Sequence, residues 1–221
     1  EKGESIIKFK EIDHLLIKAK VSVPIIYDYD EDSDFMLIED FGDNLFSKII
    51  DEDSQNILYE KAVSLLAYLY NKSVEKKIDL NNLNVYSLRI IQDECNLFID
   101  WYVNRHLKIL INEKEKIFYE KIIKNIYNKI KPKNDSIVLR DYHVDNLFFL
   151  KERKSKNQVG VIDFQDALLG SNVYDLVSLL EDVRNPIPHS LQNKMKEHFI
   201  SLTGYDSDKL ENELSFFSVQ R

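Results

Sequence analysis

The sequence predicts an α+β protein built of two unequal lobes. Three observations predict this class. A helix-periodic segment and two β-rich runs fill residues 5–39, long helix-periodic stripes follow, and a cluster of short β-prone runs lies within residues 136–163. Strands kept apart from helices in this way are typical of α+β domains. The 221 residues, 44% of them apolar, are enough to bury a large core.

Composition limits the possible partners and locations. The net charge of −8 creates no field that attracts phosphates, so we expect no nucleic-acid partner. The single cysteine, Cys95, excludes an intrachain disulfide and favours a reducing compartment. No apolar run approaches the ~18 residues of a membrane helix, and no signal peptide is visible. We therefore expect a cytoplasmic protein with no membrane partner.

The first segments predict a helix followed by a hairpin. Residues 5–20 carry apolar side chains at steps of three and four, typical of an amphipathic helix; they are Phe9, Ile12, Leu16 and Ala19. After Pro24, the β-rich runs "IIYDY" and "FMLIE" are joined by the acidic "DEDSD", so we expect a hairpin with a solvated turn. Gly42 in "DFGDN" is expected to make a turn that ends this region.

Helical stripes dominate the next part of the chain. Three of them have apolar residues at helical spacing: Leu58, Ala62, Leu65, Leu66 and Leu69; Leu88, Ile91, Cys95, Phe98 and Tyr102; and Tyr119, Ile122, Ile123, Ile126 and Ile130. The third helix is expected to end before Pro132. Further helices are expected near residues 172–184, 188–202 and 207–221. We expect each stripe to face the core, with Cys95 as a packing residue.

The stretch "SIVLRDYHVDNLFFL", residues 136–150, contains the candidate catalytic and metal-binding residues. Two β-prone runs bracket a polar island, and buried ionisable groups need partners or a metal. Asp141 and Asn146 lie in this island, and Asp163 ends the strand-like "VGVID", which we expect to return beside "LFFL". An amide oxygen and a carboxylate suit Mg²⁺, and Asp141 is free to accept a proton from an attacking hydroxyl. The spacing matches the phosphoryl-transfer template, so we expect the three side chains to converge on one cleft.

At this level of detail a family likeness can be named. The stretch "LRDYHVDNLFFL…VGVIDFQDALLGSNVYDLVSLLEDVR" resembles the aminoglycoside phosphotransferase and choline kinase superfamily. Within it, the likeness is greatest to bacterial sugar kinases that phosphorylate the anomeric hydroxyl of N-acetylmuramate and N-acetylglucosamine. "FMLIEDFGDNLF" resembles the hinge between the family's lobes, and "DECNLFIDWY" resembles a helix of the sugar-kinase branch. The resemblance runs from about residue 5 to residue 221.

The resemblance implies a protein-kinase-like, two-lobed fold and a set of site residues. Residues 1–42 would form a partial N-terminal lobe, and residues 43–221 a mainly helical, truncated catalytic lobe. By resemblance, Asp141 is the catalytic base, and Asn146 and Asp163 are the magnesium ligands. The backbone of three residues, Glu39, Asp40 and Phe41, resembles the hinge that binds the adenine of ATP. Asp175 matches a family residue that tethers the catalytic loop.

Three departures from the family pattern matter. Leu139 replaces the usual His before the Arg-Asp pair, which removes an orienting contact but no chemistry. Phe9 falls where the first helix usually has a Glu, which puts the helix-to-lysine ion pair in doubt. The family's first three strands, with the glycine-rich phosphate loop and its lysine, are absent. We therefore expect residues 1–221 alone to bind nucleotide poorly and to associate through the open edge of the hairpin, and we expect the missing N-terminal strands, added in trans, to rescue the fragment.

The favoured function is an ATP- and Mg²⁺-dependent phosphotransferase acting on a hydroxyl of a small molecule, an amino sugar of the N-acetylmuramate or N-acetylglucosamine type. The acidic chain also suits cationic acceptors, so an aminoglycoside or choline kinase is an alternative. A truncated or split kinase-like protein without activity of its own is another. A metal-dependent hydrolase using the same acids is a third.

Several other polar or aromatic residues have two interpretations each. His143 has no second His or Cys nearby, which favours a structural role over a metal ligand. Asp166 is predicted equally to contact substrate or to cap a turn. Asp100 and Trp101 are candidates to line a sugar pocket. An aromatic residue on a helix such as Trp101 more often packs against other side chains. Further residues face either a substrate or only solvent: Glu181, Asp182 and Arg184.

Overall fold

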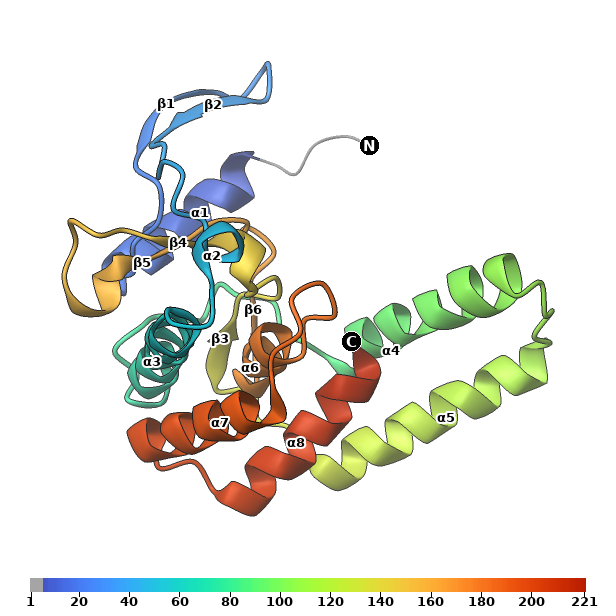
Figure 1. The fold of residues 1–221 in the computed structure, drawn as a ribbon. Coiled ribbons are helices and arrows are strands. Elements are labelled where there is room, and N and C mark those ends of the chain that lie inside the picture. Colours follow the sequence, from blue (N-terminus) through green and yellow to red (C-terminus); the bar gives the residue numbers. More distant parts are fainter. Residues whose placement is uncertain (1–5) are drawn as a thin grey trace.

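The computed structural model describes residues 6–221 and confirms the α+β class (Figure 1). Helices form most of the molecule, and the described strands form three separate two-stranded sheets. The helices are α1 (Ile6–Lys18), α2 (Phe46–Ile49), α3 (Gln55–Val74), α4 (Leu88–Leu97), the π-helical η1 (Phe98–His106), α5 (Glu113–Ile130), the short 3₁₀ turns η2 (Val144–Asn146) and η3 (Ser155–Gln158), α6 (Val173–Leu180), α7 (His189–Thr203) and α8 (Ser207–Gln220). The strands are β1 (Ile26–Asp30), β2 (Phe35–Ile38), β3 (Ser136–Val138), β4 (Leu147–Phe149), β5 (Val159–Val161) and β6 (Leu168–Gly170).

The N-terminal helix and hairpin are confirmed. The helix predicted over residues 5–20 spans α1; residue 5 lies outside the described residues. Ile12 and Leu16 are buried, and the Phe9 ring lies 4.8 Å from the Phe164 ring, which joins the helix to the region of the polar site. Strands β1 and β2 pair antiparallel across the acidic turn, and Gly42 adopts a φ of +76° that a turn requires.

The two strands around the polar island pair with other partners and not with each other. Strand β3 pairs antiparallel with β6, and β4 pairs antiparallel with β5, with Leu147 opposite Val161. The prediction that "VGVID" returns beside "LFFL" is therefore confirmed. The segment that joins β5 to β6 passes beside the polar residues of the loop, where Asn146 contacts Asp163. Asp163 lies on this segment, with a left-handed φ of +59°.

The second helical stripe is only half correct. Ile91 and Cys95 are buried in α4 as predicted, but Phe98 and Tyr102 are 52% and 48% exposed. The backbone changes from an α-helix to a π-helical turn at Phe98, and this wider turn rotates the later positions around the axis. Ile99 and Val103 face inward in place of the predicted pair. An α-helical period extended past residue 97 therefore fails.

Helices α4 and α5, joined through η1, form a hairpin that projects from the rest of the molecule (Figure 1). Of the stripe predicted for α5, only Ile123 is buried, and Ile122 and Ile126 are 40% and 38% exposed, Ile126 where it lines a cavity between α5 and α8. Helix α5 begins with a capping box between Asn112 and Glu115 and ends before Pro132, as predicted.

The main core lies between α3 and the C-terminal helices. The stripe of α3 predicted from Leu58 to Leu69 is fully buried, and it packs on α7 through residues that include Phe199. The three predicted C-terminal helices are present as α6, α7 and α8, but α6 ends at Leu180 and not near residue 184. Among the described residues, no helix has the length and apolarity needed to cross a membrane.

Candidate active site

The predicted catalytic loop is the segment between β3 and η2, and a buried carboxylate holds its backbone. The Asp175 side chain on α6 is fully buried and accepts hydrogen bonds from the backbone N–H groups of Leu139 (2.7 Å) and Arg140 (2.9 Å). Arg140 adopts a left-handed φ of +71°, which is uncommon for a residue with a Cβ and persists only when the surroundings hold it. This places Asp175 in the tethering position that the resemblance implied. Its burial raises the pKa of the Asp175 carboxyl to about 7, although the two N–H donors act in the opposite direction.

The three residues predicted to converge on one cleft are neighbours, but their side chains line two cavities: Asn146 and Asp163 line one, and Asp141 lines the other. The Asn146 side-chain Nδ2 donates a hydrogen bond of 3.0 Å to the backbone carbonyl of Asp141 and one of 3.2 Å to Oδ2 of Asp163. The backbone carbonyl of Asn146 also accepts from the N–H of Ile162, 3.1 Å away, which ties the polar island to β5. The strand pairing between β4 and β5 thus brings Asp163 to Asn146 across 17 positions of the chain.

The oxygen atoms of this group suit a magnesium ion. Both hydrogens of the Asn146 amide nitrogen have partners, so its oxygen Oδ1 is the atom left to bind a cation. Asp163 has an exposed carboxylate whose Oδ1 accepts from Gln165 at 2.8 Å. Mg²⁺ prefers one or two such hard oxygen ligands and takes the remainder from water or substrate phosphates. Asn146 and Asp163 would hold the ion.

A cavity of about 470 Å³ opens beside Asn146 and Asp163. Its remaining walls are mostly apolar: Ile6, Phe9, Pro24, Met36, Ile38, Ile162 and Gln165. Cavities of this size and character are typical of small-molecule sites. The predicted hinge follows directly after Ile38. The N–H of Glu39 donates to the carbonyl of Ile25, so that the adenine contacts predicted for the hinge would have to come from other main-chain groups.

A second cavity, of about 440 Å³, is lined by Asp141. The Asp141 side chain is 51% exposed and lines this cavity together with residues of α6, α8 and the loop after α6. Asp141 therefore connects the two cavities: its backbone carbonyl contacts Asn146, which lines the first, and its side chain lines the second.

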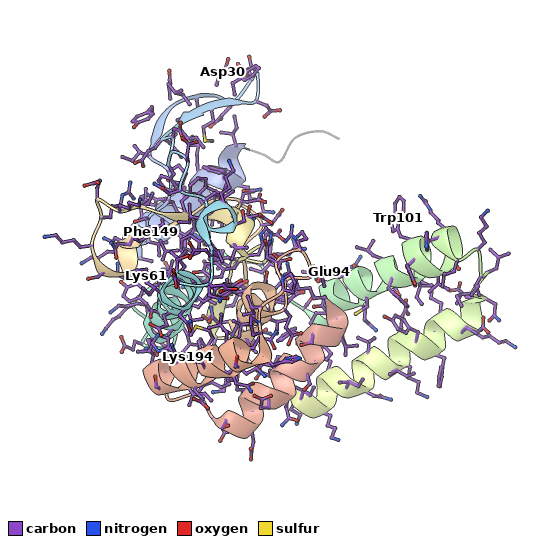
Figure 2. All side chains as sticks on the ribbon, in the orientation of Figure 1. Asp30, Lys61, Glu94, Trp101, Phe149 and Lys194 are labelled. Atoms are coloured by element: carbon purple, nitrogen blue, oxygen red, sulfur yellow. The ribbon has the colours of Figure 1, made fainter. Side chains whose placement is uncertain are left out.

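An ion pair that the sequence did not indicate connects the helical hairpin to the catalytic loop. Glu94 on α4 accepts from Nη2 of Arg140 at 2.6 Å, and its other oxygen accepts from the Tyr86 hydroxyl and from Gln220 at 2.7 Å. Figure 2 shows Glu94 at the base of the hairpin, beside the main body, and Trp101 towards its far end. Arg140 is thus held through both its backbone and its side chain. Nothing in the spacing marks Glu94, since its partner lies 46 positions later.

The structure decides between the two interpretations of Trp101 and shows the partners of Asp100 and Asp166. Trp101 is 58% exposed and stacks with Arg105 at 3.9 Å, so the packing interpretation is wrong; it lines neither cavity beside Asp141. Asp100 forms an ion pair with Lys116. Asp166 contacts Nζ of Lys8 on α1. Cys95 is buried, as predicted.

His143 lies in a small polar cluster with Asp145 and Asp182. Potential ligand atoms of the three residues lie within 4.8 Å of one another. Both carboxylates, however, already accept hydrogen bonds from the Asn185 amide, and Nε of Arg184 forms an ion pair with Oδ1 of Asp182 at 2.9 Å. Burial is the main cause that lowers the pKa of the His143 imidazole and so favours its neutral form. These contacts support the structural role predicted for His143.

Comparison with known proteins fits this geometry. The family model described as the phosphotransferase enzyme family matches residues 2–210. The chain belongs to this family. It is 30% identical over 174 residues to the N-acetylmuramate/N-acetylglucosamine kinase of Pseudomonas putida, covering 79% of this chain and 48% of that protein. It is 28% identical to the enzyme of the same name from Caulobacter vibrioides, covering 76% and 47%. The chain spans about half the length of the curated relatives it matches.

Solved structures show the same fold. The aminoglycoside-3'-phosphotransferase of type VIII superposes with a TM-score of 0.66 at 14% identity, over 98% of this chain and 79% of that one. The aminoglycoside phosphotransferase APH(3'')-Id from Streptomyces rimosus, in complex with ADP and streptomycin, superposes with a TM-score of 0.62 at 11% identity, over 98% and 82%. The fold is therefore that of the protein-kinase-like aminoglycoside phosphotransferases, as the resemblance implied. These comparisons give no support to a missing lobe bound in trans.

Proposed function

We propose that this phosphotransferase-family protein transfers the γ-phosphoryl group of ATP, with Mg²⁺, to a hydroxyl of an amino sugar of the N-acetylmuramate or N-acetylglucosamine type. The observation that carries the proposal is the hydrogen-bonded group of Asp141, Asn146 and Asp163, whose members line two cavities. The sugar-kinase relatives support the acceptor class. The structural neighbours support the fold alone, so an aminoglycoside or choline acceptor remains the weaker alternative.

Asp141 acts as the base in this proposal. As the acceptor hydroxyl attacks the γ-phosphorus, its proton passes to the Asp141 carboxylate, the bond from phosphorus to the bridging oxygen breaks, and ADP leaves. The half-exposed carboxylate faces the acceptor cavity, while the Asp141 backbone is fixed through Asn146 and through the Asp175 tether on Arg140. Mg²⁺, held by Asn146 and Asp163, would neutralise charge on the phosphates. The positioned loop supplies orientation, which contributes much of the rate in phosphoryl transfer.

The nucleotide belongs to the 470 Å³ cavity. The side chains of Met36 and Ile38 give this cavity an apolar wall, which suits a purine base. The hinge residues Glu39, Asp40 and Phe41 come next in the chain, and the carbonyl of Glu39 and the N–H of Phe41 are the main-chain groups proposed to bind the base edge. Use of cytosolic MgATP and a single buried thiol are consistent with a cytoplasmic location, which belongs to the same proposal.

Steady-state kinetics of the complete protein tests the function. We expect MgATP-dependent phosphorylation of N-acetylmuramate or N-acetylglucosamine, and much weaker turnover of kanamycin or choline. Asp141→Asn should lower kcat by ~10²-fold or more with little change in the Kd of MgADP, since it removes a positioned base and no nucleotide contact. Asp163→Ala should abolish the Mg²⁺ dependence of nucleotide binding in calorimetry.

The matched control is Asp53→Asn, which changes an exposed carboxylate in a turn before α3. It should behave as the unmodified protein. Turnover of kanamycin with none of the sugars would replace the proposed acceptor class by the alternative. Phosphate release from ATP at full rate without any acceptor would favour a hydrolase.

A further inference from the structure

The acceptor cavity contains two arginines beside the proposed catalytic base. Arg184, in the loop after α6, and Arg221, just after α8, both line it together with Asp141, Glu181 and Asp182. Arg221 donates from Nη1 to the carbonyl of Arg140 at 3.0 Å, and its Nη2 lies 3.9 Å from the Asp141 carboxylate. The lining of this cavity of about 440 Å³ thus carries two guanidinium groups and three carboxylates, so the way they pair determines which charges of a ligand it can meet.

Within residues 6–221, the hydrogen bonds of the Arg184 side chain all go to one carboxylate, that of Asp182. Its Nε donates to Oδ1 of Asp182 at 2.9 Å, and its Nη2 lies 3.4 Å from Oδ2 of the same carboxylate. Asp182 is buried, with 6% of its surface exposed, and it also accepts from the backbone N–H of Arg184 and from the Asn185 amide. The Arg184 side chain itself is 53% exposed. A buried acid thus orients a guanidinium that lines the cavity, and its Nη1 group, 3.8 Å from Asp145, makes no hydrogen bond among the described residues.

We propose that Arg184 binds the carboxylate of a singly anionic amino-sugar acceptor, and that Asp182 is the positioning residue that orients it. This inference rests on the proposed function and gives the acceptor cavity its selectivity. The relatives' name pairs two sugars, and N-acetylmuramate is N-acetylglucosamine that carries an added lactyl carboxylate. Discrimination between such a pair depends on what meets that one group.

An arginine that is already paired suits both sugars. When the acceptor has no carboxylate, the charge of Arg184 is still compensated by Asp182 and by the nearby Asp145, so that no bare cation is left in the cavity. When the carboxylate is present, the free donors of Arg184 accommodate it in the planar geometry that guanidinium groups favour. The site therefore accepts the neutral sugar and binds the anionic one more tightly.

The same cavity disfavours a polycation. Of its acids, Asp182 is paired with Arg184, and Asp141 is required as the base. The Glu181 carboxylate has no hydrogen bond or ion pair among the described residues and is the one acid of the lining left for an ammonium group. A polycationic aminoglycoside would therefore find a single unpaired carboxylate in this cavity for its several ammonium groups.

The test compares the two sugars in the complete protein with MgATP. Arg184→Gln removes the cation and keeps a polar side chain. We expect the KM for N-acetylmuramate to rise about tenfold or more, since hydrogen bonds to a charged group contribute at least that factor, while the KM for N-acetylglucosamine and both kcat values change less than about twofold. The matched control is Arg89→Gln, on the exposed face of α4, where the side chain is 91% exposed.

Each result decides the matter. An unchanged preference between the sugars, or an equal loss for both, would overturn the role of Arg184. If the unmodified protein phosphorylates neither sugar, the proposed function fails, and calorimetric binding of N-acetylmuramate then decides the inference: binding that Arg184→Gln abolishes upholds it, and absence of binding overturns it. Should Arg184→Gln not fold, Arg184→Lys keeps the charge without the planar fork. It is expected to lose part of the preference for N-acetylmuramate, and full preference would contradict the proposal.

Discussion

Replacement of Asp175 tests how the catalytic loop is held. In Asp175→Ala, the N–H groups of Leu139 and Arg140 lose the acceptor that they share inside the protein. Each buried donor left without a partner costs about 1–3 kcal/mol, so we expect the free energy of unfolding to fall by roughly 2–6 kcal/mol. The loop that carries Asp141 also loses the contact that stabilises the left-handed backbone of Arg140, so turnover should fall even under conditions where the variant is folded.

Asp175→Asn gives a different signature because the carboxyl titrates. Burial raises the pKa of Asp175 to about 7 in the folded protein, against an ordinary value of 3.8. The folded state therefore binds this proton more tightly than the unfolded chain does. The resulting stabilisation is fully present below pH 3.8 and is lost as the pH rises through 7. The difference between these pKa values corresponds to about 4 kcal/mol, an upper bound on the change. Asparagine does not titrate, so the variant should gain stability relative to the unmodified protein as the pH rises.

Urea unfolding at pH 5, 6, 7 and 8 measures both effects, with Asp53→Asn as the exposed control. We expect the free-energy difference between the unmodified protein and Asp175→Asn to shift by about 2–3 kcal/mol between pH 5 and pH 8. A difference that is the same at every pH would show that the Asp175 carboxyl is ionised throughout this range. A cost below about 1 kcal/mol for Asp175→Ala would show that the two N–H groups have found other acceptors, which would refute the tether.

Three other changes give separate tests. Glu94→Gln removes the charge that faces Arg140; we expect kcat to fall roughly tenfold with little change in the KM for MgATP, because a charge-assisted hydrogen bond contributes about 1.5–3 kcal/mol. A loss of kcat that only matches the unfolded fraction seen by circular dichroism in the same buffer would attribute the effect to unfolding and contradict the prediction. Gly160→Ala places a Cβ 2.7 Å from the Phe41 ring, so a lower Tm and a weaker Kd for MgADP are expected in thermal melts and calorimetry. Burial raises the pKa of Asp13 to about 6, so its stabilising contribution is lost as the pH rises through 6; urea melts of Asp13→Asn should show the variant relatively more stable at pH 7.5 than at pH 4.5, and no trend would contradict this.

The sequence predicted those parts of the site whose residues lie close together in the chain or on adjoining short strands. Asp141 and Asn146 share one loop, and the alternation of β-prone runs around them was enough to bring Asp163 beside Asn146. The hairpin, the turn at Gly42 and the class of fold followed in the same way from local patterns. The roles of these residues, and of the hinge from Glu39 to Phe41, stay predictions.

Contacts between distant segments were beyond the reach of the sequence. Strand β3 pairs with β6 and not with the neighbouring β4, and no pattern in these three-residue strands indicates which partner each one takes. The ion pair of Glu94 with Arg140 joins two elements that share no pattern. Phe98 and Tyr102 were wrongly expected inside, since one π-helical turn rotates every later position and nothing in the residue types marks where it begins.

The two strand pairs around the catalytic loop have unequal tolerance to changes in chain length. The turn from Leu150 to Gln158 joins β4 to β5 outside the site, so an added residue there would lengthen an exposed turn and leave both ladders in register. The stretch from Ile162 to Ala167 joins β5 to β6, and each of these strands is fixed to a different side of the loop. One inserted residue there would need to slip a register or bulge beside Asp163. Among homologues, variation in length should therefore collect in the first connection, and the second should keep one length.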